Sequence, residues 1–219
     1  MIAEAKERLG KLAAEMIKDG MIIGLGSGST TAEFIKGLGE RIKEEGITVY
    51  GVPTSYQAHL LGELNSIRIV SSDRIDLAVD GADQIDARNF ISKGGGGALL
   101  KEKLVDYRAE RLIILADRNK FVDILSLVCV EIHPQAIHTV LETLETYGTA
   151  RLRTIKGKSI ENGDQVFITE SGNVIIDVNM KVKDPVETEK ALNSIPGIIE
   201  NGLFTRECVI LGRGSGIPG

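Results

Sequence analysis

The chain has 219 residues, 42% of them apolar and 26% charged, which is the composition of a globular protein long enough for one large or two small domains. Its formal net charge of −5 provides no overall positive field for a nucleic-acid backbone, so we expect no nucleic-acid partner, while a local basic pocket for one small anion stays compatible with it. Residues 1–20 predict an amphipathic helix rather than a secretion signal, and no segment has the roughly 18–20 apolar residues that span a bilayer. We therefore expect a cytoplasmic protein without membrane contact.

The first half of the chain alternates short apolar runs with helical patterns. Strands are expected at 21–25, 49–52, 67–70, 77–80 and 112–116, and helices at 30–45, 55–64 and about 98–109. Strands separated by helices imply right-handed crossovers. This half therefore predicts an α/β fold with a doubly wound, Rossmann-like parallel sheet.

From residue 127 the pattern is that of a second, smaller α+β domain. Strands are expected at 127–134, 150–155, 166–169, 174–178 and 198–203, and helices at 135–147 and 184–193. This order fits a ferredoxin-like domain. The apolar run 208–212 is expected to return to the first domain. The expected division is a Rossmann-like domain of residues 1–126 and 205–219 and a ferredoxin-like domain of residues 127–204.

The cysteines and histidines indicate no chemistry of their own. Cys129 and Cys208 lie in apolar, strand-like runs, and two buried thiols in a reducing compartment are favoured over a disulfide between them. His59, His133 and His138 have no Cys or carboxylate cluster beside them in the sequence, so structural roles are expected and no metal site.

Three glycine-marked loops are expected at the carboxyl ends of parallel strands, where open α/β sheets bind their ligands. The first is Gly24–Thr30 (GLGSGST), in which backbone N–H groups and the hydroxyls of Ser27, Ser29 and Thr30 can surround an anion at a helix start. It lacks the third glycine of a dinucleotide fingerprint and the lysine of a Walker motif. The loop predicts a site for a single phosphate, and the alternative is a plain tight turn.

The second loop, Asp80-Gly81-Ala82-Asp83, follows the apolar run LAV. Two carboxylates three residues apart can face one pocket and take different roles if their environments separate their pKa values. The alternative is that one aspartate caps a turn and the other is solvated. The motif alone does not decide between these readings.

The third loop begins at Lys93 and continues through four glycines. Consecutive glycines cost chain entropy and are unusual unless the backbone must approach a ligand closely. Lys93 supplies a cation for a developing oxyanion. Glu102, one helical turn past the loop, can face back toward the glycines while Lys101 and Lys103 point sideways. For an isolated Glu102 the favoured alternative is a solvated carboxylate at a helix start.

Taken together, the motifs GLGSGST, VDGADQID, SKGGGGALLKEK, ADRNK, VIIDVN and IPGIIENGLF resemble, in order and spacing from about residue 5 to 212, the type A ribose-5-phosphate isomerase family. The resemblance implies an aldose–ketose isomerase of the non-oxidative pentose phosphate pathway that interconverts ribose 5-phosphate and ribulose 5-phosphate through an enediolate. It also implies a small-molecule sugar phosphate as substrate, no cofactor and no metal. A homodimer or homotetramer is expected, with the small domain as a lid or oligomerisation domain.

The resemblance assigns a role to each matching residue. It makes Glu102 the base that moves a proton between C2 and C1, and Asp80 the residue that assists ring opening. Asp83 and Lys93 match groups that hold sugar hydroxyls and stabilise the enediolate. The other matched substrate-binding positions are Ser27, Gly28, Ser29, Thr30, Gly81, Ala82, Gly94, Gly95, Gly96 and Lys120, with Lys6 near the phosphate. Gln84 stands where the family usually has Glu, which puts an electrostatic role there in doubt, although catalysis should survive.

Three other functions fit the sequence less well. A sugar-phosphate sensor on the same fold should lack the base or the lysine, whereas Glu102 and Lys93 are both present. A related acyl-CoA transferase or amino-sugar isomerase needs its glutamate or histidine in a different context. A non-catalytic Rossmann-like module leaves the four glycines unexplained. The residue types themselves suit an enediolate mechanism, which needs one carboxylate with access to both carbons and donors for the oxygen charge.

Overall fold

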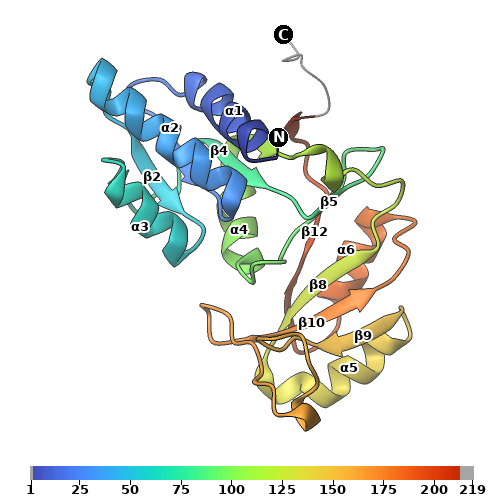
Figure 1. Ribbon diagram of the computed structural model, residues 1–219. Coiled ribbons are helices and arrows are strands. Elements are labelled where there is room, and N and C mark those ends of the chain that lie inside the picture. Colours follow the sequence, from blue (N-terminus) through green and yellow to red (C-terminus); the bar gives the residue numbers. More distant parts are fainter. Residues whose placement is uncertain (1, 213–219) are drawn as a thin grey trace. The chain divides into compact units, whose positions relative to one another are not determined.

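The computed structural model describes residues 2–212, and their contacts divide them into two compact units (Figure 1). The first unit contains residues 2–82, 101–121 and 206–212. The second unit contains residues 83–100 and 122–205. The chain therefore passes between the units four times, and two of these passages, at Ala82–Asp83 and at Leu100–Lys101, lie inside motifs that the sequence singled out.

The first unit is a parallel sheet covered by helices. Its strands are β1 (Ile22–Leu25), β2 (Tyr50–Pro53), β3 (Arg68–Ile69), β4 (Ile75–Gly81), β7 (Ala109–Leu115) and β13 (Val209–Leu211). Its helical segments are α1 (Ile2–Glu15), α2 (Ser29–Glu45), α3 (Tyr56–Leu64), η1 (Arg118–Lys120) and most of α4 (Leu99–Asp106). Within the described residues the strand order is β13-β7-β4-β1-β2-β3, with every pair parallel. The predicted parallel sheet and the return of residues 208–212 to it are confirmed.

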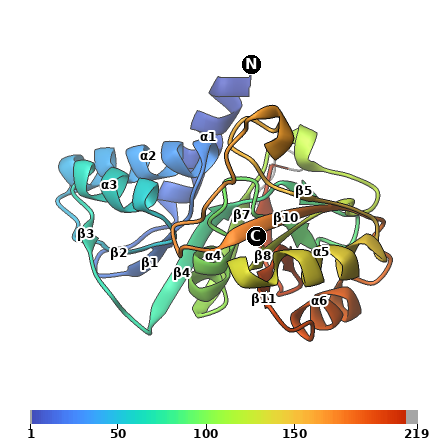
Figure 2. The ribbon, with the colours of Figure 1, turned by 90° about the horizontal axis from the view of Figure 1, so that it is seen from below.

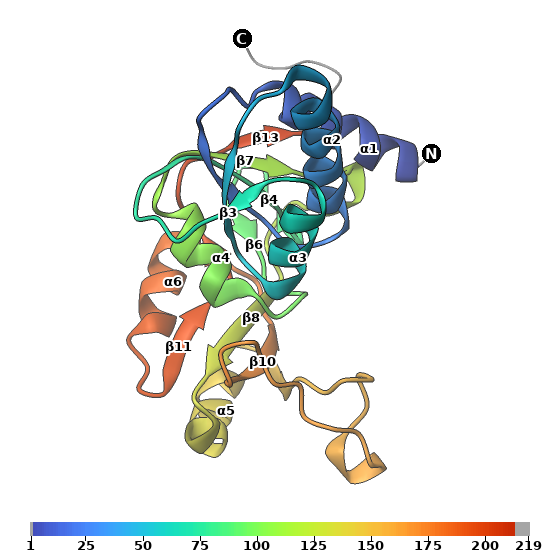
Figure 3. The ribbon, with the colours of Figure 1, turned by 90° about the vertical axis from the view of Figure 1, so that its left-hand side faces the viewer.

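Helices cover both faces of this sheet because successive strand residues point to opposite sides. Ile23, Leu25, Leu77 and Val79 share a core with residues of α1 and α2, and these helices and α3 lie along one side of the strands (Figure 2). The other face receives α4 (Figure 3). A Cβ atom on Gly24 would lie 2.7 Å from Val105 Cγ1, so the glycine lets α4 pack directly on β1. The sheet is doubly wound, as predicted.

The second unit contains a ferredoxin-like domain. Its elements are β8 (Leu127–Ile132), η2 (Pro134–Ala136), α5 (Ile137–Glu145), β9 (Thr149–Leu152), η3 (Ile160–Asn162), β10 (Val174–Asn179), α6 (Pro185–Asn193) and β11 (Ile198–Asn201). The sheet is antiparallel in the order β11-β8-β10-β9, and Val128, Val130, Val174 and Ile176 face α5 and α6. The predicted ferredoxin-like order is confirmed, with two rather than three strands between α5 and α6. The predicted strand at 166–169 is wrong, since this segment makes isolated bridges, Thr154 with Val166 and Ile168 with Val174.

A small second sheet explains where the units divide. β5 (Gln84–Ile85), β6 (Ile91–Ser92) and β12 (Leu203–Phe204) pair antiparallel in the order β12-β6-β5. This pairing ties residues 83–100 to the second unit, whereas the sequence suggested that the small domain begins at residue 127. The four-glycine loop therefore follows β6. The expectation that it follows a strand of the parallel sheet is wrong. Two-residue strands carry no periodic pattern from which they could be predicted.

Candidate functional site

In the first unit, the loops that follow β1, β2, β4 and β7 meet at the carboxyl edge of the parallel sheet. The Gly26 N–H donates to the Val79 carbonyl at 2.9 Å, and the Thr54 N–H donates to the Leu25 carbonyl at 2.9 Å. These bonds tie the loop after β1 to β4 and the loop after β2 to β1. This edge is the ligand-binding side of an open α/β sheet.

The loop after β1 leaves the start of α2 open to an anion. Gly28 has φ +98°, a conformation that favours glycine, and in the described residues no side chain caps the first N–H groups of α2. Lys6 Nζ donates to Ser29 Oγ at 2.8 Å, which brings a cation to the same helix end. The Ser27 hydroxyl is instead held inside the edge by Thr54 and Ser55, at 2.8 and 2.6 Å. Helix dipole, open N–H groups and Lys6 together suit a phosphate.

Asp80 is fully buried within the same edge. It lies inside β4, opposite Ile114, within the predicted strand 77–80, and β4 continues one residue further to Gly81. Its Oδ1 accepts hydrogen bonds from the N–H groups of Gly81 at 2.7 Å and Ser27 at 3.2 Å. A Cβ atom on Gly26 would overlap the Asp80 carboxylate, so the first glycine motif and the second fit against each other.

Glu102 lies in the first turn of α4 with only 7% of its surface exposed. This burial contradicts the alternative of a solvated carboxylate at a helix start. Lys101 lies beside Glu102 with its Nζ 4.9 Å from the centre of the Tyr56 ring. Lys103, expected at the side of the helix, is also buried, with its Nζ 5.7 Å from the ring of Tyr107. A carboxylate kept from water in this way is suited to proton transfer.

Lys120 belongs to the same unit and the same edge. It ends η1, which follows the carboxyl end of β7, the neighbour of β4 in the sheet. The Asp117 carboxylate caps this turn by accepting from the Asn119 N–H at 3.0 Å. Lys120 is half-buried.

The remaining predicted residues lie in the second unit, where Asp83 and the glycine loop form one hydrogen-bonded group. Asp83 Oδ2 accepts from the Gly95 N–H at 2.7 Å. Gly94 has φ +108°, and a Cβ atom there would lie 2.8 Å from both the Cys129 Cβ and the Leu99 Cδ2 atoms. Only glycine fits this position. The backbone of the loop therefore packs closely against Cys129 and Leu99, which leaves no room for a side chain at Gly94.

Lys93 is buried at the start of this loop, with 3% of its surface exposed. Its N–H donates to the Gly202 carbonyl at 2.8 Å. Its Nζ lies 5.6 Å from the centre of the Phe204 ring. The IPGIIENGLF motif, which contains both Gly202 and Phe204, therefore supports the lysine.

Gln84 has a hydrogen-bonding role that needs no charge. Its Oε1 accepts from the N–H groups of Ser126 at 2.8 Å and Leu127 at 3.1 Å, and its Nε2 donates to Ser126 Oγ at 3.0 Å. A glutamate oxygen can accept the same two N–H bonds. The two residue types are therefore interchangeable for this contact.

Five polar residues around these groups were not predicted from the sequence. Thr54, Ser55 and Gln57 line the first unit's edge, where Gln57 Oε1 accepts from the Gly28 N–H at 3.2 Å. Their position directly after a predicted strand was a usable signal. In the second unit, Arg153 contacts the glycine loop, and Asp177 contacts Arg153. Asp177 lies inside the VIIDVN motif, whereas no local pattern marks Arg153.

Both cysteines are free thiols, as favoured by the sequence, with Cys129 buried and Cys208 half-buried. Burial raises the pKa of Cys129 to about 12 and that of Cys208 to about 11, so both are neutral near pH 7.

Across residues 2–212, His, Cys, Asp and Glu side chains form no group of three or more that could hold a metal. In the same range no helix is long and apolar enough to cross a membrane.

Comparison with known sequences gives one consistent result. Residues 50–216 match the family model of ribose 5-phosphate isomerase A (phosphoriboisomerase A). The ribose-5-phosphate isomerase A of Methanocaldococcus jannaschii is 41% identical over 98% of this chain and 96% of its own length. That of Pyrococcus horikoshii is 44% identical over 99% of this chain and 97% of its own.

Comparison with solved structures agrees. The structure of ribose 5-phosphate isomerase A from M. jannaschii superposes with a TM-score of 0.89 and 42% identity, over 97% of this chain and 95% of that one. A D-ribose-5-phosphate isomerase in complex with phospho-erythronic acid superposes with a TM-score of 0.86 and 46% identity, over 92% of this chain and 90% of that one.

Proposed function

We propose that Glu102 carries the proton between C2 and C1 of the sugar in this chain. The chain belongs to the ribose 5-phosphate isomerase A family and isomerises ribose 5-phosphate. The observation that carries the proposal is the burial of Glu102 on the first turn of α4, directly after the glycine loop in sequence. A positioned carboxylate in such surroundings can take a proton and return it without losing it at once to water.

The proposed reaction begins with the closed sugar. Asp80 assists ring opening, in which the anomeric hydroxyl loses a proton and the ring oxygen gains one. Glu102 then removes the C2 proton of the open aldose, and the electron pair forms the enediolate. The proton returns to C1, while the C2 hydroxyl proton is lost and the C1 oxygen is protonated. The product is the ketose, so the atoms and charges balance without an external reductant.

The enediolate needs positive charge and hydrogen-bond donors at its oxygens. We assign this role to Lys93 and to the backbone of Gly94–Gly96, with Asp83 holding the sugar hydroxyls. The buried ammonium of Lys93 and the bond from Gly95 to Asp83 support this assignment. The phosphate is assigned to the loop Ser27–Thr30 with Lys6, and Lys120 makes a further substrate contact.

The proton route can be tested in D₂O. During conversion of ribose 5-phosphate, a carboxylate that holds the proton between two steps should let some deuterium enter C1 of ribulose 5-phosphate. NMR of the product formed early in the reaction measures this. A product free of deuterium at C1 would instead indicate a direct hydride shift from C2, and the base assignment would have to be abandoned.

We also propose that the protein is a homodimer or homotetramer and works in the cytoplasm. Support comes from α3, where the large side chains of Tyr56, Leu60 and Leu64 are 61%, 58% and 77% exposed at four-residue intervals, on one side of the helix. A second copy of the chain would bury this stripe. Sedimentation velocity should show a species of at least twice the 23.6 kDa chain mass. A single species of one chain's mass at micromolar concentration would rule out the oligomer.

A further inference from the structure

Arg153, directly after β9, uses every nitrogen of its guanidinium group within the second unit. Nη1 donates to the carbonyl of Gly94 at 2.7 Å and to that of Gly95 at 3.2 Å. Nε donates to Asp177 Oδ2 at 2.8 Å, and Nη2 donates to Asp177 Oδ1 and, at 3.0 Å, to the Cys129 sulfur. Only 13% of the Arg153 side chain is exposed. This arrangement joins the strands of the domain to the glycine loop.

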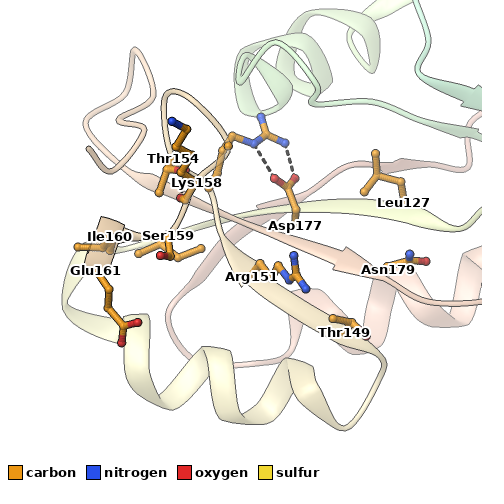
Figure 4. Close-up of a pocket in the computed structure, with 13 residues that line it drawn as sticks. Leu127, Thr149, Arg151, Thr154, Lys158, Ser159, Ile160, Glu161, Asp177 and Asn179 are labelled. Carbon is orange, nitrogen blue, oxygen red and sulfur yellow. Dashed lines mark hydrogen bonds and ion pairs between the residues drawn. The ribbon is translucent and has the colours of Figure 1, made fainter. Parts of the chain in front are cut away.

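Asp177 fixes the direction of the guanidinium. It lies on β10, where the antiparallel register sets it opposite Arg151, and it accepts two parallel hydrogen bonds from Arg153, drawn as the dashed lines that end on Asp177 in Figure 4. Burial lowers the pKa of Arg153, but the hydrogen bonds and the charge of Asp177, together with the contact to the Cys129 sulfur, outweigh it, and the net pKa lies above its ordinary value. The guanidinium therefore stays charged and its planar fork has one orientation.

The same side chain touches the other end of the loop through Phe167. The guanidinium carbon lies 5.8 Å from the centre of the Phe167 ring. A Cβ atom on Gly97 would lie 2.5 Å from that ring, so loop and ring are in close contact. Gly97 itself has φ +78° and donates to the Gly94 carbonyl at 2.9 Å. Arg153 and Phe167 thus hold in one conformation a loop whose glycines lose more conformational freedom on ordering than other residues do.

Holding two carbonyls also sets two N–H groups, because a trans peptide unit directs its C=O and N–H to opposite sides. The Gly94 carbonyl points to Arg153, and the N–H of the same peptide, on Gly95, points to Asp83, as the 2.7 Å bond records. The Gly95 carbonyl also points to Arg153. Its peptide partner, the Gly96 N–H, is therefore turned to the side of the Asp83 carboxylate.

We propose that Arg153, oriented by Asp177, is a positioning residue that fixes the peptide planes at Gly94–Gly95 and Gly95–Gly96. It thereby directs the Gly95 N–H to Asp83 and the Gly96 N–H to the reacting end of the sugar that Asp83 holds. This inference rests on the proposed role of the glycine loop in binding that end. Arg153 does not touch the substrate in this scheme. It acts through the direction of the loop's dipoles, which stabilise enediolate charge only when they are already in place.

The test uses the full-length Arg153→Met variant, with Arg151→Met as the matched control. Arg151 lies two residues earlier, on β9, and is exposed; like Arg153, it lines a pocket of about 900 Å³ in the second unit (Figure 4). We expect Arg153→Met to lower kcat about 10- to 100-fold per folded molecule, with KM within about threefold. Arg151→Met should keep the kinetics of the unchanged protein. A normal kcat in Arg153→Met would overturn the inference.

Two inhibitors separate positioning from general loosening of the fold. The carboxylate of phospho-erythronic acid can take the place of the enediolate oxygens, whereas inorganic phosphate can occupy only the phosphate site. In Arg153→Met, phospho-erythronic acid should bind weaker by about the factor lost in kcat, and phosphate should inhibit as before. Equal weakening of both inhibitors would show a merely structural role and would overturn the inference.

Two further variants keep the test decisive if Arg153→Met does not fold, or if the glycine loop does not bind the reacting end of the sugar. Asp177→Asn keeps the size of the side chain but removes its charge, and it should lower kcat by a smaller factor than Arg153→Met does. A normal kcat in Asp177→Asn would overturn the inference even if Arg153→Met cannot be purified. Lys93→Met tests the loop directly. Impaired Lys93→Met beside normal Arg153→Met would overturn the positioning inference alone. Normal turnover in Lys93→Met would overturn the loop's assigned role as well.

Discussion

Replacing Glu102 by Gln is expected to lower kcat by about 10²–10⁴-fold, the range typical of positioned acid–base catalysis. The amide keeps the shape of the buried side chain but cannot accept the proton from C2. The melting temperature and KM should therefore stay close to those of the unchanged protein. Steady-state kinetics with ribose 5-phosphate, together with thermal unfolding followed by circular dichroism, measure all three quantities.

Two further variants test whether the carboxylate itself is responsible. Glu102→Asp keeps the charge and shortens the reach by one methylene, so it should be less impaired than Glu102→Gln. Lys101→Ala removes the neighbouring side chain, which contacts Tyr56, and should cost little activity. Near-normal turnover by Glu102→Gln would remove the base assignment and make Asp80 or Asp83 the next candidate.

Removing the phosphate from the substrate should have an effect of similar size. D-ribose lacks the dianion that we assign to the open start of α2 and to Lys6. Hydrogen bonds to charged groups are worth about 1.5–3 kcal/mol each, so losing several should lower kcat/KM at least about 10³-fold. Some of this loss should appear in kcat, because binding at a remote group helps to place the reacting carbons. Parallel assays with D-ribose and ribose 5-phosphate measure the ratio.

A variant of the loop links this ratio to particular residues. Thr30→Ala removes one hydroxyl from the first turn of α2 and should raise KM for ribose 5-phosphate about tenfold or more while changing kcat less. Thr143→Ala is the control, because that exposed hydroxyl donates to the Thr139 carbonyl in α5. If D-ribose were as good a substrate as its phosphate, the loop would have been assigned wrongly.

The sequence alone determined the fold class and the family of this protein. Apolar runs of four to seven residues separated by amphipathic segments are strong local signals, and they marked β1, β4 and β7 as well as the ferredoxin-like order from β8 to β11. The three glycine motifs were also visible, because glycine runs and paired aspartates stand out against the ordinary composition of a globular chain. These features depend on residues that are close together in sequence.

Tertiary structure decided the features that depend on distant pairing. β6 is a two-residue strand whose partner β12 lies more than a hundred residues later, and this pairing moves residues 83–100 into the second unit. The segment 166–169 has a strand-like composition, yet it forms only isolated bridges. Strand propensity is weak when the neighbour that would complete the hydrogen bonds is missing.

Long-range packing also explains why some properties of the site residues could not be predicted from the sequence. Burial of Glu102 could not be read from the sequence, because a glutamate at a helix start is usually solvated and only the packing around α4 excludes water from it. Arg153 directly follows β9 outside any motif, and Asp177 lies on β10 within the VIIDVN motif, but the sequence at neither position shows that the two are in contact. Their importance arises from the register of β9 and β10 and from the position of the glycine loop within reach of Arg153, and long-range packing sets both.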